Sequence, residues 1–330
     1  MSRVARIVST ARHLPEVEVT NASLKQRLGP AFHEAVDKLE EATGIRKRWW
    51  APDGVATSDL ALPAARLALE RAGRRPEDLD LIILGTDSPD YLTPATSVVL
   101  QHKLGAKNAG TYDVGCACAS FPTGLANAAG LIAANPSIKT VLVVGVYLMH
   151  RLASPDDPLV FLYGDGAGAA VLVAGEEPGF LSAAFSADGS YHGHWGIFSG
   201  GTAEPASEES VRAGRTRVKM LQRYPPEINH DGWPKLVRKL ASQDGFGVHD
   251  LDLVLFSQVR KPSIELVMAD LGLPYAKTHT IMEEMGYTGS ACLAMALDDA
   301  IEKKKVGPGS LVALVGSGVG YNQAGVVFRL

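Results

Sequence analysis

One cysteine stands where a strand pattern gives way to a helix pattern, and its position suits covalent chemistry. Cys118 lies within residues 112–121, which begin with apolar and small residues, and a helical pattern follows at residues 123–134. A thiol in the first turn of a helix feels the positive end of the helix dipole, which lowers its pKa. The thiolate is the form that attacks an acyl carbon. The sequence therefore predicts that Cys118 is a nucleophile that accepts an acyl group.

The composition is that of an ordinary globular protein, with 46% hydrophobic and 21% charged residues in a chain of 330. The net charge of -4 gives no electrostatic reason to expect nucleic acid or a membrane surface as a partner. No uninterrupted apolar run reaches the roughly 20 residues of a membrane span, and the first residues lack a signal-peptide core. Three cysteines fit neither a disulfide framework nor a zinc site, so we expect a reducing cytoplasm.

Two pairs of apolar runs repeat at a similar distance along the chain. Residues 78–84 resemble residues 250–256, and residues 141–145 resemble residues 311–316. Runs of this length are typical of strands that are buried on both faces. The repetition predicts two similar halves.

Helical patterns separate these strands, and such alternation indicates a mostly parallel sheet covered by helices. We expect helices at residues 58–72, 97–104, 123–134, 233–243, 263–271 and 291–304. The predicted halves are residues 1–174, with the nucleophile, and residues 175–330, with its partner residues. Residues 176–224 interrupt the pattern, and we expect one strand there followed by a long excursion near the site.

Five segments, in order and spread over nearly the whole chain, resemble the ketoacyl synthase III-like family of the thiolase fold. They are residues 44–48 (Gly-Ile-Arg-Lys-Arg), 89–97, 112–121, 164–172 (beginning Gly-Asp-Gly-Ala-Gly-Ala) and 316–320 (Gly-Ser-Gly-Val-Gly). The resemblance implies an α/β protein of the thiolase fold, with five αβαβα layers and two pseudo-symmetric halves. It also implies a homodimer and a thioester-forming cysteine. No cofactor is expected; acyl-CoA or acyl-carrier protein would be the substrate.

On this resemblance the family nucleophile falls on Cys118, and one oxyanion donor falls on Val319, next to Gly318 in the C-terminal glycine turn. A tetrahedral intermediate needs donors fixed at its oxyanion, and the backbone N–H of Cys118 is a second candidate. Alternatively, the turn needs its glycines only for backbone conformation.

The family's decarboxylating members use a histidine and an asparagine, and the matching positions here are Ser257 and Tyr287. Serine cannot act as a base near neutral pH, and tyrosine is a donor far bulkier than asparagine. Thr93 takes the place of a glutamate found in the olefin-forming branch. If decarboxylation is absent, we expect Ser257 and Tyr287 to shape the acceptor site or to hydrogen-bond the acceptor, and we assign Thr93 to the substrate-binding set.

A relocated base is the alternative. His192 and His194 are one source; they could also be loop residues without a role or, less suitably, two ligands of a metal site, and we assign no metal. Asp87 is another source, because related hydroxymethylglutaryl synthases resemble this segment and carry a catalytic glutamate there. Asp87 could instead cap backbone N–H groups at the end of a strand.

The residues that would hold the coenzyme A part of the acyl donor look altered. The tryptophan and arginine that hold coenzyme A in the family fall on Lys38 and Ala42, whereas Arg151 resembles the family's second arginine. A basic set could attract pyrophosphate or an acidic carrier protein, or could simply be a solvated face. Its members are Lys38, Arg46, Lys47, Arg48 and Arg151.

Three functions stay open. The first is an acyltransferase that moves an acyl group from an acyl-carrier-protein or coenzyme A thioester through Cys118 to an acceptor, in specialised fatty-acid-like or polyketide-like biosynthesis. The second is 3-oxoacyl synthase III-type carbon–carbon condensation with a relocated base. The third is a catalytically silent subunit of a heterodimeric synthase, although the retained cysteine argues against it.

Overall fold

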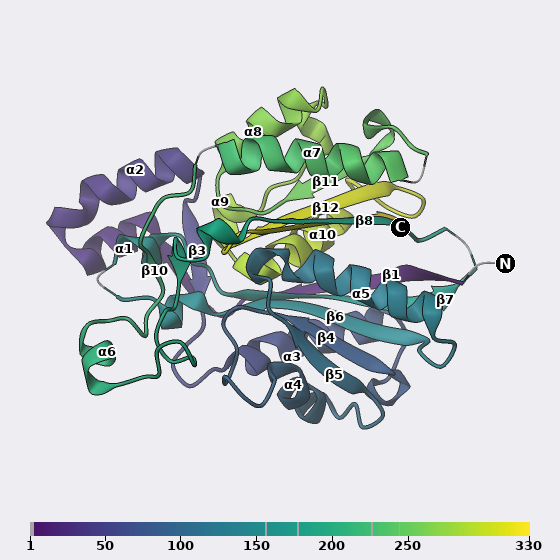
Figure 1. Ribbon diagram of the computed structural model, residues 1–330, viewed down its shortest axis with the longest axis horizontal. Coiled ribbons are helices and arrows are strands. Elements are labelled where there is room, and N and C mark those ends of the chain that lie inside the picture. The colour runs from purple at the N-terminus through teal and green to yellow at the C-terminus, as the bar shows by residue number, and fades with distance from the viewer. Residues whose placement is uncertain (1–2, 156, 177, 226, 244) are drawn as a thin grey trace.

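Two large sheets form the frame of the computed structural model, which describes residues 3–155, 157–176, 178–225, 227–243 and 245–330 (Figure 1). The first sheet has the order β1 (Val4–His13), β7 (Gly166–Gly175), β6 (Thr140–Tyr147), β4 (Leu81–Gly85) and β5 (Gly110–Val114). The second has the order β11 (Leu253–Phe256), β12 (Leu311–Gly318), β13 (Asn322–Arg329) and β8 (Phe180–Ala187).

Helices complete five layers, as Figure 1 shows from bottom to top. The first sheet is covered on its outer face by α3 (Thr57–Arg71) and α4 (Thr96–Leu104). Between the sheets lie α5 (Ser120–Ala134) and α10 (Cys292–Glu302). The second sheet is covered by α7 (Glu227–Gln243) and α8 (Lys261–Asp270). This is the predicted αβαβα order, and all six predicted helices are present; five lie within about three residues of their expected bounds, and α7 begins at Glu227 instead of residue 233.

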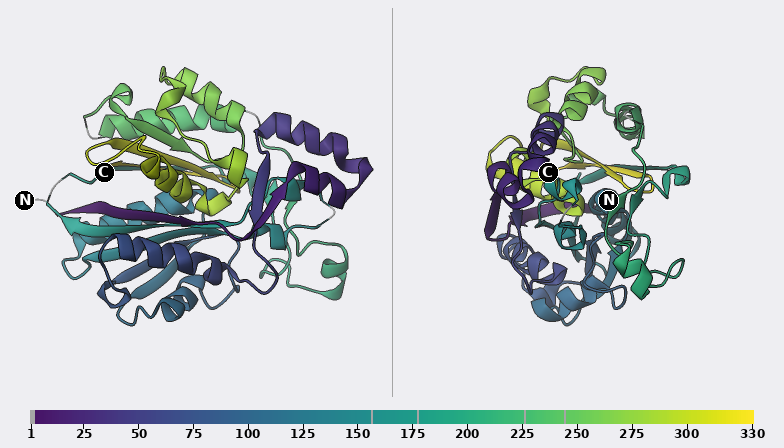
Figure 2. Two further views of the ribbon diagram at one scale, coloured as in Figure 1. Left: turned by 180° about the vertical axis from the view of Figure 1, so that it is seen from behind. Right: turned by 90° about the vertical axis from the view of Figure 1, so that its left-hand side faces the viewer.

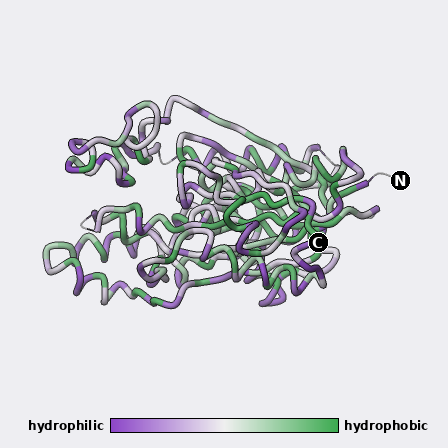
Figure 3. The backbone as a smooth tube through the Cα atoms, turned by 90° about the horizontal axis from the view of Figure 1, so that it is seen from below, coloured by the Kyte–Doolittle hydropathy of each residue, from purple (hydrophilic) through white to green (hydrophobic). Residues whose placement is uncertain are grey.

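The two central helices are apolar because both of their sides face a sheet. Nearly every residue of α10 is buried, including two acidic ones. The run Ala117–Ala134 is long and apolar enough to cross a membrane by composition alone, but 61% of it is buried inside the protein. A helix that is apolar all round is typical of a core as well as of a membrane span. Figure 3 shows the hydrophobic residues concentrated in this central region.

The repeated sequence patterns fall on equivalent strands. β4 and β6 are parallel neighbours in the first sheet, and β11 and β12 are parallel neighbours in the second. Each central helix begins after a short 3₁₀ turn, η3 (Ala117–Ala119) before α5 and η9 (Gly289–Ala291) before α10. The boundary predicted between residues 174 and 175 falls on the last two residues of β7; the division into two domains stays a prediction.

Two excursions project from the end of the molecule opposite the termini (Figures 1 and 2). The first, which the sequence analysis did not predict, contains β2 (Val17–Thr20), α1 (Asn21–Leu28), α2 (His33–Thr43) and β3 (Lys47–Trp50). The second follows β8, in the stretch where an excursion was predicted, and contains β9 (Trp195–Gly196), α6 (Glu208–Arg212) and β10 (Lys219–Met220). A further short helix, α9 (Met282–Met285), precedes η9.

Candidate active site

Cys118 sits in a tight turn between β5 and α5, at the centre of the molecule. The preceding Ala117 has φ of 47°, in the left-handed region that non-glycine residues seldom adopt. The turn is held because the Cys116 N–H donates to Ser120 Oγ at 2.9 Å and the Ala119 N–H donates to the Cys116 carbonyl at 3.0 Å. Cys118 is buried, with 3% of its surface exposed. The expected position at the start of a helix is therefore present.

The end of β12 packs directly on this turn. A Cβ atom on Gly318 would lie 2.1 Å from the Cys116 carbonyl oxygen, and one on Gly316 would lie 2.6 Å from the Cys118 carbonyl oxygen. Distances this short exclude any side chain, so both glycines allow the strand to approach the nucleophile turn. Gly318 thus has a structural reason to be glycine, whatever its part in catalysis.

Tyr287 is the side chain that the structure brings to Cys118. It lies between α9 and η9, and its backbone is held because its N–H donates to the Leu162 carbonyl at 2.8 Å and its carbonyl accepts from Gly164 at 3.0 Å. Its hydroxyl contacts Cys118 Sγ within hydrogen-bonding range. The alignment placed Tyr287 at the site, and the geometry agrees with that placement.

Two further tyrosines pack next to Tyr287. The rings of Tyr147, at the end of β6, and Tyr287 have centroids 5.8 Å apart, and Tyr163 lies 6.1 Å beyond Tyr147. A Cβ on Gly289 would lie 2.2 Å from the Tyr147 ring, so this ring packs against bare backbone. Tyr287, whose hydroxyl contacts the thiol, thus packs on Tyr147, which in turn packs on Tyr163; of these three tyrosines the sequence analysis identified only Tyr287.

The electrostatics of the thiol are opposite to the expectation from the helix dipole. Burial raises the pKa of Cys118 well above its usual value, and the charge of Asp87 and the neighbouring Cys292 raise it further. The hydrogen bond with Tyr287 works in the other direction but does not outweigh burial. The predicted low pKa is therefore wrong for this structure. Cys118 rests as a neutral thiol and needs a proton acceptor before it can attack.

Asp87 is a carboxylic acid whose charge raises the pKa of that thiol. It follows β4 by two residues and is partly buried. Its Oδ1 accepts a hydrogen bond from Ser290 Oγ at 2.8 Å. Burial raises the pKa of Asp87 to about 6, although the bond from Ser290 partly opposes the rise. A carboxylate that titrates near neutral pH has the basicity that proton transfer needs.

Ser257 is buried next to the glycine turn, but its hydroxyl is already engaged. Its Oγ accepts a hydrogen bond from the Ser317 N–H at 2.9 Å, and its own N–H donates to the Val315 carbonyl at 3.2 Å. The hydroxyl and the N–H of Ser257 are thus bound to β12 and not to Cys118, and its carbonyl accepts from the Val259 N–H at 3.2 Å. This geometry favours a structural clamp on the glycine turn over the expected contact to an acceptor.

Val319 and Gly320 form the turn between β12 and β13. Both are partly buried, and the Gly320 N–H donates to Tyr224 Oη at 3.2 Å. The peptide bond between Gly320 and Tyr321 is cis. The Gly320 donor is thus occupied within the chain, and the assignment of the Val319 N–H as an oxyanion donor stays a prediction.

The two loop histidines differ in their relation to the site. His192 is exposed, and its Nδ1 lies 3.1 Å from the Gly189 carbonyl. His194 stacks on Tyr224 with ring centroids 5.4 Å apart. The Cys118 thiol influences the pKa of Tyr224, so His194 adjoins the site through that ring. Among the described residues, no group of three or more His, Cys, Asp or Glu is arranged to hold a metal ion.

The residues predicted to bind the donor are dispersed. Thr93 is exposed in the loop before α4, and its peptide bond to Pro94 is cis. Arg151 donates to the Pro52 carbonyl at 2.7 Å. Arg46 is paired with Glu284.

Most of the predicted basic set is neutralised or hidden. Lys38 pairs with Glu34 at 2.6 Å, and Lys47 pairs with Glu18 at 2.8 Å. Arg48 is fully buried, and burial lowers its pKa to about 9. The hypothesis of a single positive patch for pyrophosphate or a carrier protein is therefore weakened.

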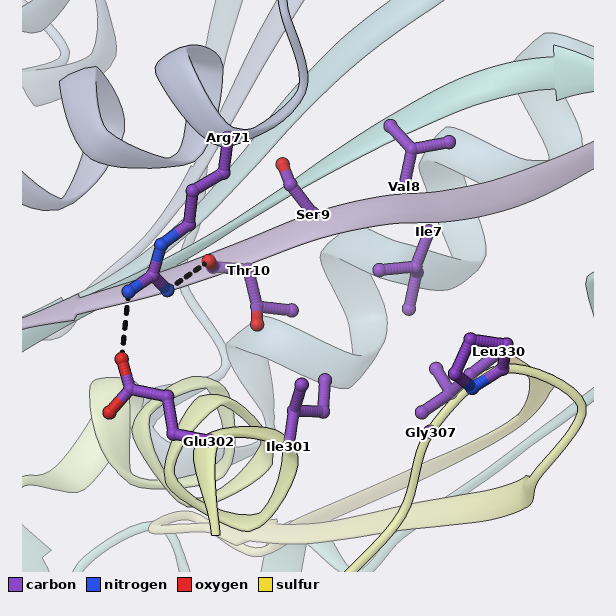
Figure 4. A pocket seen from close by; sticks show the side chains of 10 residues that line it. Ile7, Val8, Ser9, Thr10, Arg71, Ile301, Glu302, Gly307 and Leu330 are labelled. Carbon is purple, nitrogen blue, oxygen red and sulfur yellow. Dashed lines mark hydrogen bonds and ion pairs between the residues drawn. The ribbon is translucent and has the colours of Figure 1, made fainter. Parts of the chain in front are cut away.

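Cavities lie around the core of the described part of the chain, and the three below do not include Cys118 in their lining. One of about 360 Å³ is far from the nucleophile, between β1, the end of α10 and Leu330 (Figure 4). One of about 290 Å³ borders the nucleophile turn at Cys116. One of about 300 Å³ is lined by Ser88, next to Asp87, and by Arg151. The second of these cavities borders the turn that carries the nucleophile, and the last borders the loop that follows Asp87.

Comparison with known proteins decides the family. A model of 3-oxoacyl-[acyl-carrier-protein (ACP)] synthase III matches residues 112–189, and the model of its C-terminal part matches residues 241–330. A beta-ketoacyl-[acyl-carrier-protein] synthase III of Syntrophomonas wolfei subsp. wolfei is 35% identical over 329 residues, which cover 98% of this chain and 97% of the relative. The chain belongs to the 3-oxoacyl-[acyl-carrier-protein] synthase III family.

Solved structures place this synthase III relative in the thiolase fold. The 3-oxoacyl-(acyl carrier protein) synthase III of Pseudomonas aeruginosa PAO1 has a TM-score of 0.88 and 28% identity, and the match covers 99% of this chain and 98% of that one. The priming beta-ketosynthase of the R1128 polyketide biosynthetic pathway has a TM-score of 0.90 and 28% identity, with 100% and 97% covered. The predicted fold and the predicted resemblance are confirmed, and the protein is a transferase.

Membership of the synthase III family sharpens the question that the sequence raised. At the positions where the family's decarboxylating members carry histidine and asparagine, this chain has Ser257 and Tyr287. The Ser257 hydroxyl accepts a hydrogen bond from a backbone N–H, and the Tyr287 hydroxyl contacts the nucleophilic sulfur. Sequence reasoning missed Tyr147, Tyr163 and Ser290. The signal for Ser290 was its place three residues after Tyr287, in the turn that was already assigned to the site.

Proposed function

We propose that this synthase III relative is an acyltransferase that works through a thioester on Cys118. The thiol attacks an acyl-CoA or acyl-carrier-protein thioester, the donor thiol leaves with one proton, and the acyl group passes to an acceptor with an O–H, N–H or S–H group. The observation that supports this proposal most directly is the contact between Tyr287 and Cys118. The phenol of Tyr287 occupies the position where decarboxylating relatives have asparagine. Carbon dioxide release from a malonyl group has no histidine–asparagine pair here to stabilise its enolate.

The names of the relatives support the nature of the donor. They are acyl-carrier-protein synthases and a polyketide priming ketosynthase, so we assign the reaction to fatty-acid-like or polyketide-like biosynthesis. We place it in the cytoplasm. We also propose a homodimer, because β5 is an edge strand of the first sheet. Tyr91 and Leu92, in the loop before α4, are 59% and 82% exposed and would be covered by a second copy.

Condensation is the second candidate function, and one observation favours it. The family's relatives are 3-oxoacyl synthases, and Asp87 supplies a base that carbon–carbon bond formation needs. The silent-subunit hypothesis is the weakest, because the nucleophile turn and its supporting glycines are intact.

The test is the intact mass of the purified protein after incubation with a panel of acyl-CoA and acyl-carrier-protein thioesters. We expect one acyl adduct, lost in Cys118→Ala and kept in Cys116→Ala, which removes a thiol two positions away. Malonyl-carrier protein is then added to the acylated enzyme. Release of carbon dioxide with a 3-oxoacyl product would replace acyl transfer by condensation, and no adduct from any donor would overturn both.

A further inference from the structure

The phenol of Tyr287 is the side-chain group that the structure places on the nucleophilic sulfur. Its hydroxyl and Cys118 Sγ share a hydrogen bond, and the two residues are only 5% and 3% exposed. While the sulfur carries its proton, either atom can donate this bond. Once the sulfur is ionised only the phenol can donate, and a hydrogen bond to a charged acceptor is roughly twice as strong as a neutral one. The contact therefore favours the thiolate over the thiol.

The backbone around Tyr287 fixes this phenol before any reaction begins. The Tyr287 N–H donates to the Leu162 carbonyl at 2.8 Å, and its carbonyl accepts from the Gly164 N–H at 3.0 Å. These two bonds pair Tyr287 with Tyr163 in a parallel bridge. The Tyr287 ring also packs on Tyr147, with centroids 5.8 Å apart. A donor that is already in place needs no reorganisation when charge develops on its acceptor.

The electrostatics of the pair define Tyr287 as a donor and not as a base. Burial raises the pKa of Cys118 and the charge of Asp87 adds to the rise, whereas the hydrogen bonds from Tyr287 and from the backbone N–H of Cys118 itself oppose it. Burial also raises the pKa of Tyr287 well above its usual value, and the neighbouring thiol raises it further. The phenol therefore keeps its proton at neutral pH.

The other titratable groups around the pair come from several elements. They are Asp87 after β4, Tyr147 on β6, Tyr163 before β7, Tyr224 after β10, Cys292 on α10 and Tyr321 after β12. Of these, only Asp87 is ionised at neutral pH, and its charge opposes the thiolate. The favourable contribution to the thiolate thus comes from hydrogen bonds, and Tyr287 supplies the one from a side chain.

We propose that Tyr287 is a catalytic residue that donates its phenol O–H to the Cys118 sulfur whenever that sulfur carries negative charge, an inference that rests on the proposed acyl transfer. In loading, the sulfur bonds to the acyl carbon, the donor's carbon–sulfur bond breaks, and the Cys118 proton ends on the leaving thiol. In release, the acceptor bonds to the acyl carbon, the Cys118 carbon–sulfur bond breaks with its electron pair on sulfur, and the acceptor's proton ends on Cys118. Tyr287 keeps its own proton throughout.

This role accounts for the type of residue at position 287. Decarboxylating relatives have asparagine there, as part of a pair that stabilises an enolate. Acyl transfer to an O–H, N–H or S–H group forms no enolate, so one of the charges that remains to be stabilised is on sulfur. The longer side chain of Tyr287 brings its hydroxyl onto that sulfur.

The first experiment measures thiol activation without acyl transfer. The rate of alkylation of Cys118 by iodoacetamide is measured against pH in the native protein and in Tyr287→Phe, and peptide mass identifies the modified cysteine. Loss of the hydrogen bond should lower the thiolate fraction about tenfold. The more basic sulfur is a better nucleophile, which offsets part of this loss, so the rate should fall about threefold at each pH below the thiol pKa. Phenylalanine is smaller than tyrosine, so reduced access cannot cause a fall.

Two further proteins make the result specific. Tyr275→Phe removes a phenol hydroxyl from a tyrosine that is 40% exposed, in η8 (Tyr275–Lys277), and should leave the alkylation rate unchanged. The second carries 3-fluorotyrosine at position 287, which keeps the ring and the hydroxyl but makes the O–H a stronger donor. Its alkylation rate should rise above that of the native protein, so this protein tests the proposal even where Tyr287→Phe does not fold.

The second experiment follows loading by the burst of p-nitrophenol from p-nitrophenyl hexanoate. Its leaving group needs no protonation, so the burst should slow in Tyr287→Phe by the same factor as alkylation. Alkylation that is unchanged or faster in Tyr287→Phe, or slower with 3-fluorotyrosine, would overturn the role of Tyr287 and leave the acyl adduct intact. Absence of any burst or acyl adduct in the native protein, with alkylation still slowed in Tyr287→Phe, would overturn the proposed function alone.

Discussion

Asp87, near the nucleophile, and Asp299, on α10, are both carboxylates in the interior. Their surroundings shift their pKa values in opposite directions. Burial raises the pKa of Asp87 to about 6, and the hydrogen bonds from the Ser290 hydroxyl and from the backbone N–H of Asp87 itself oppose the rise only in part. Burial also disfavours the charge on Asp299, but the hydrogen bond from His279, together with Lys303 and Arg12, outweighs it and lowers the pKa of Asp299 to about 2.

The carboxylate on α10 belongs to an ion-pair cluster that joins the two halves of the fold. This α10 ion-pair cluster consists of Arg12, Arg71, His279, Asp298, Asp299, Glu302 and Lys303. Figure 4 shows how Arg71 on α3 bridges the Thr10 carbonyl on β1 and Glu302 on α10. Cations therefore surround the acids of this cluster, whereas the hydrogen bonds and ion pairs recorded for Asp87 in the described part of the chain include no Lys, Arg or His.

The largest expected effect is the loss of the central acid of the α10 ion-pair cluster. Asp298 is 1% exposed and accepts hydrogen bonds from Thr10 Oγ1 at 2.8 Å, Arg12 at 2.6 Å and Arg71 at 2.9 Å. Asp298→Ala removes the buried acid that both guanidinium groups share; Arg12 keeps Asp299, and both arginines keep Glu302. We expect the free energy of unfolding to fall by about 3 kcal/mol, the lower end of the cost of breaking a buried pair. Urea denaturation at neutral pH measures it.

An exposed ion pair provides the matched control for that variant. Asp270 pairs with Arg238 at 2.9 Å on the surface of α8, and about half of each side chain is exposed. Asp270→Ala should cost less than about 1 kcal/mol, since solvent screens such pairs. Equal losses in the two variants would show that the α10 ion-pair cluster does not owe its strength to burial.

A smaller effect, with a defined pH window, is expected for Asp299→Asn. The folded pKa of about 2 lies below the usual value of 3.8, so the carboxylate stabilises the fold above about pH 4 and loses this contribution as the pH falls toward 2. At neutral pH the variant should lose about 2 kcal/mol relative to the native protein. Denaturation curves at several pH values should show that difference shrinking in acid; a difference that stays constant would rule out the charge as its cause.

The fold could be predicted from sequence because its signals are local. Apolar runs marked β4, β6, β11 and β12, and the all-apolar pattern of α5 marked a buried helix. The excursion with α1 and α2 was missed, because its short helices carry many charged residues and little apolar periodicity.

The chemistry of the site was less predictable, because it depends on contacts between distant segments. The helix dipole is a local feature and suggested a low pKa for Cys118, whereas burial and the charge of Asp87, in the loop after β4, raise that pKa. The predicted positive patch failed for the same reason. Its partners Glu284 and Glu18 are distant in sequence from Arg46 and Lys47, and only the folded chain brings them together.

The smallest expected effect has the opposite sign and separates the two carboxylates most clearly. Because the pKa of Asp87 is raised in the fold, ionising it between about pH 4 and pH 6 destabilises the protein. Asp87→Asn removes that cost. Below about pH 4 the variant should have the same free energy of unfolding as the native protein, and above pH 6 it should be more stable by about 1 kcal/mol. This figure is reduced because Asp87 is partly exposed to solvent, which screens its charge. Thermal unfolding across this pH range measures the difference. A gain in stability above pH 6 would show that the charge of Asp87 destabilises the fold, which is the pattern of a residue kept for a reason other than stability. A loss of stability at neutral pH would instead make Asp87 a structural partner of Ser290, like the acids of the α10 ion-pair cluster.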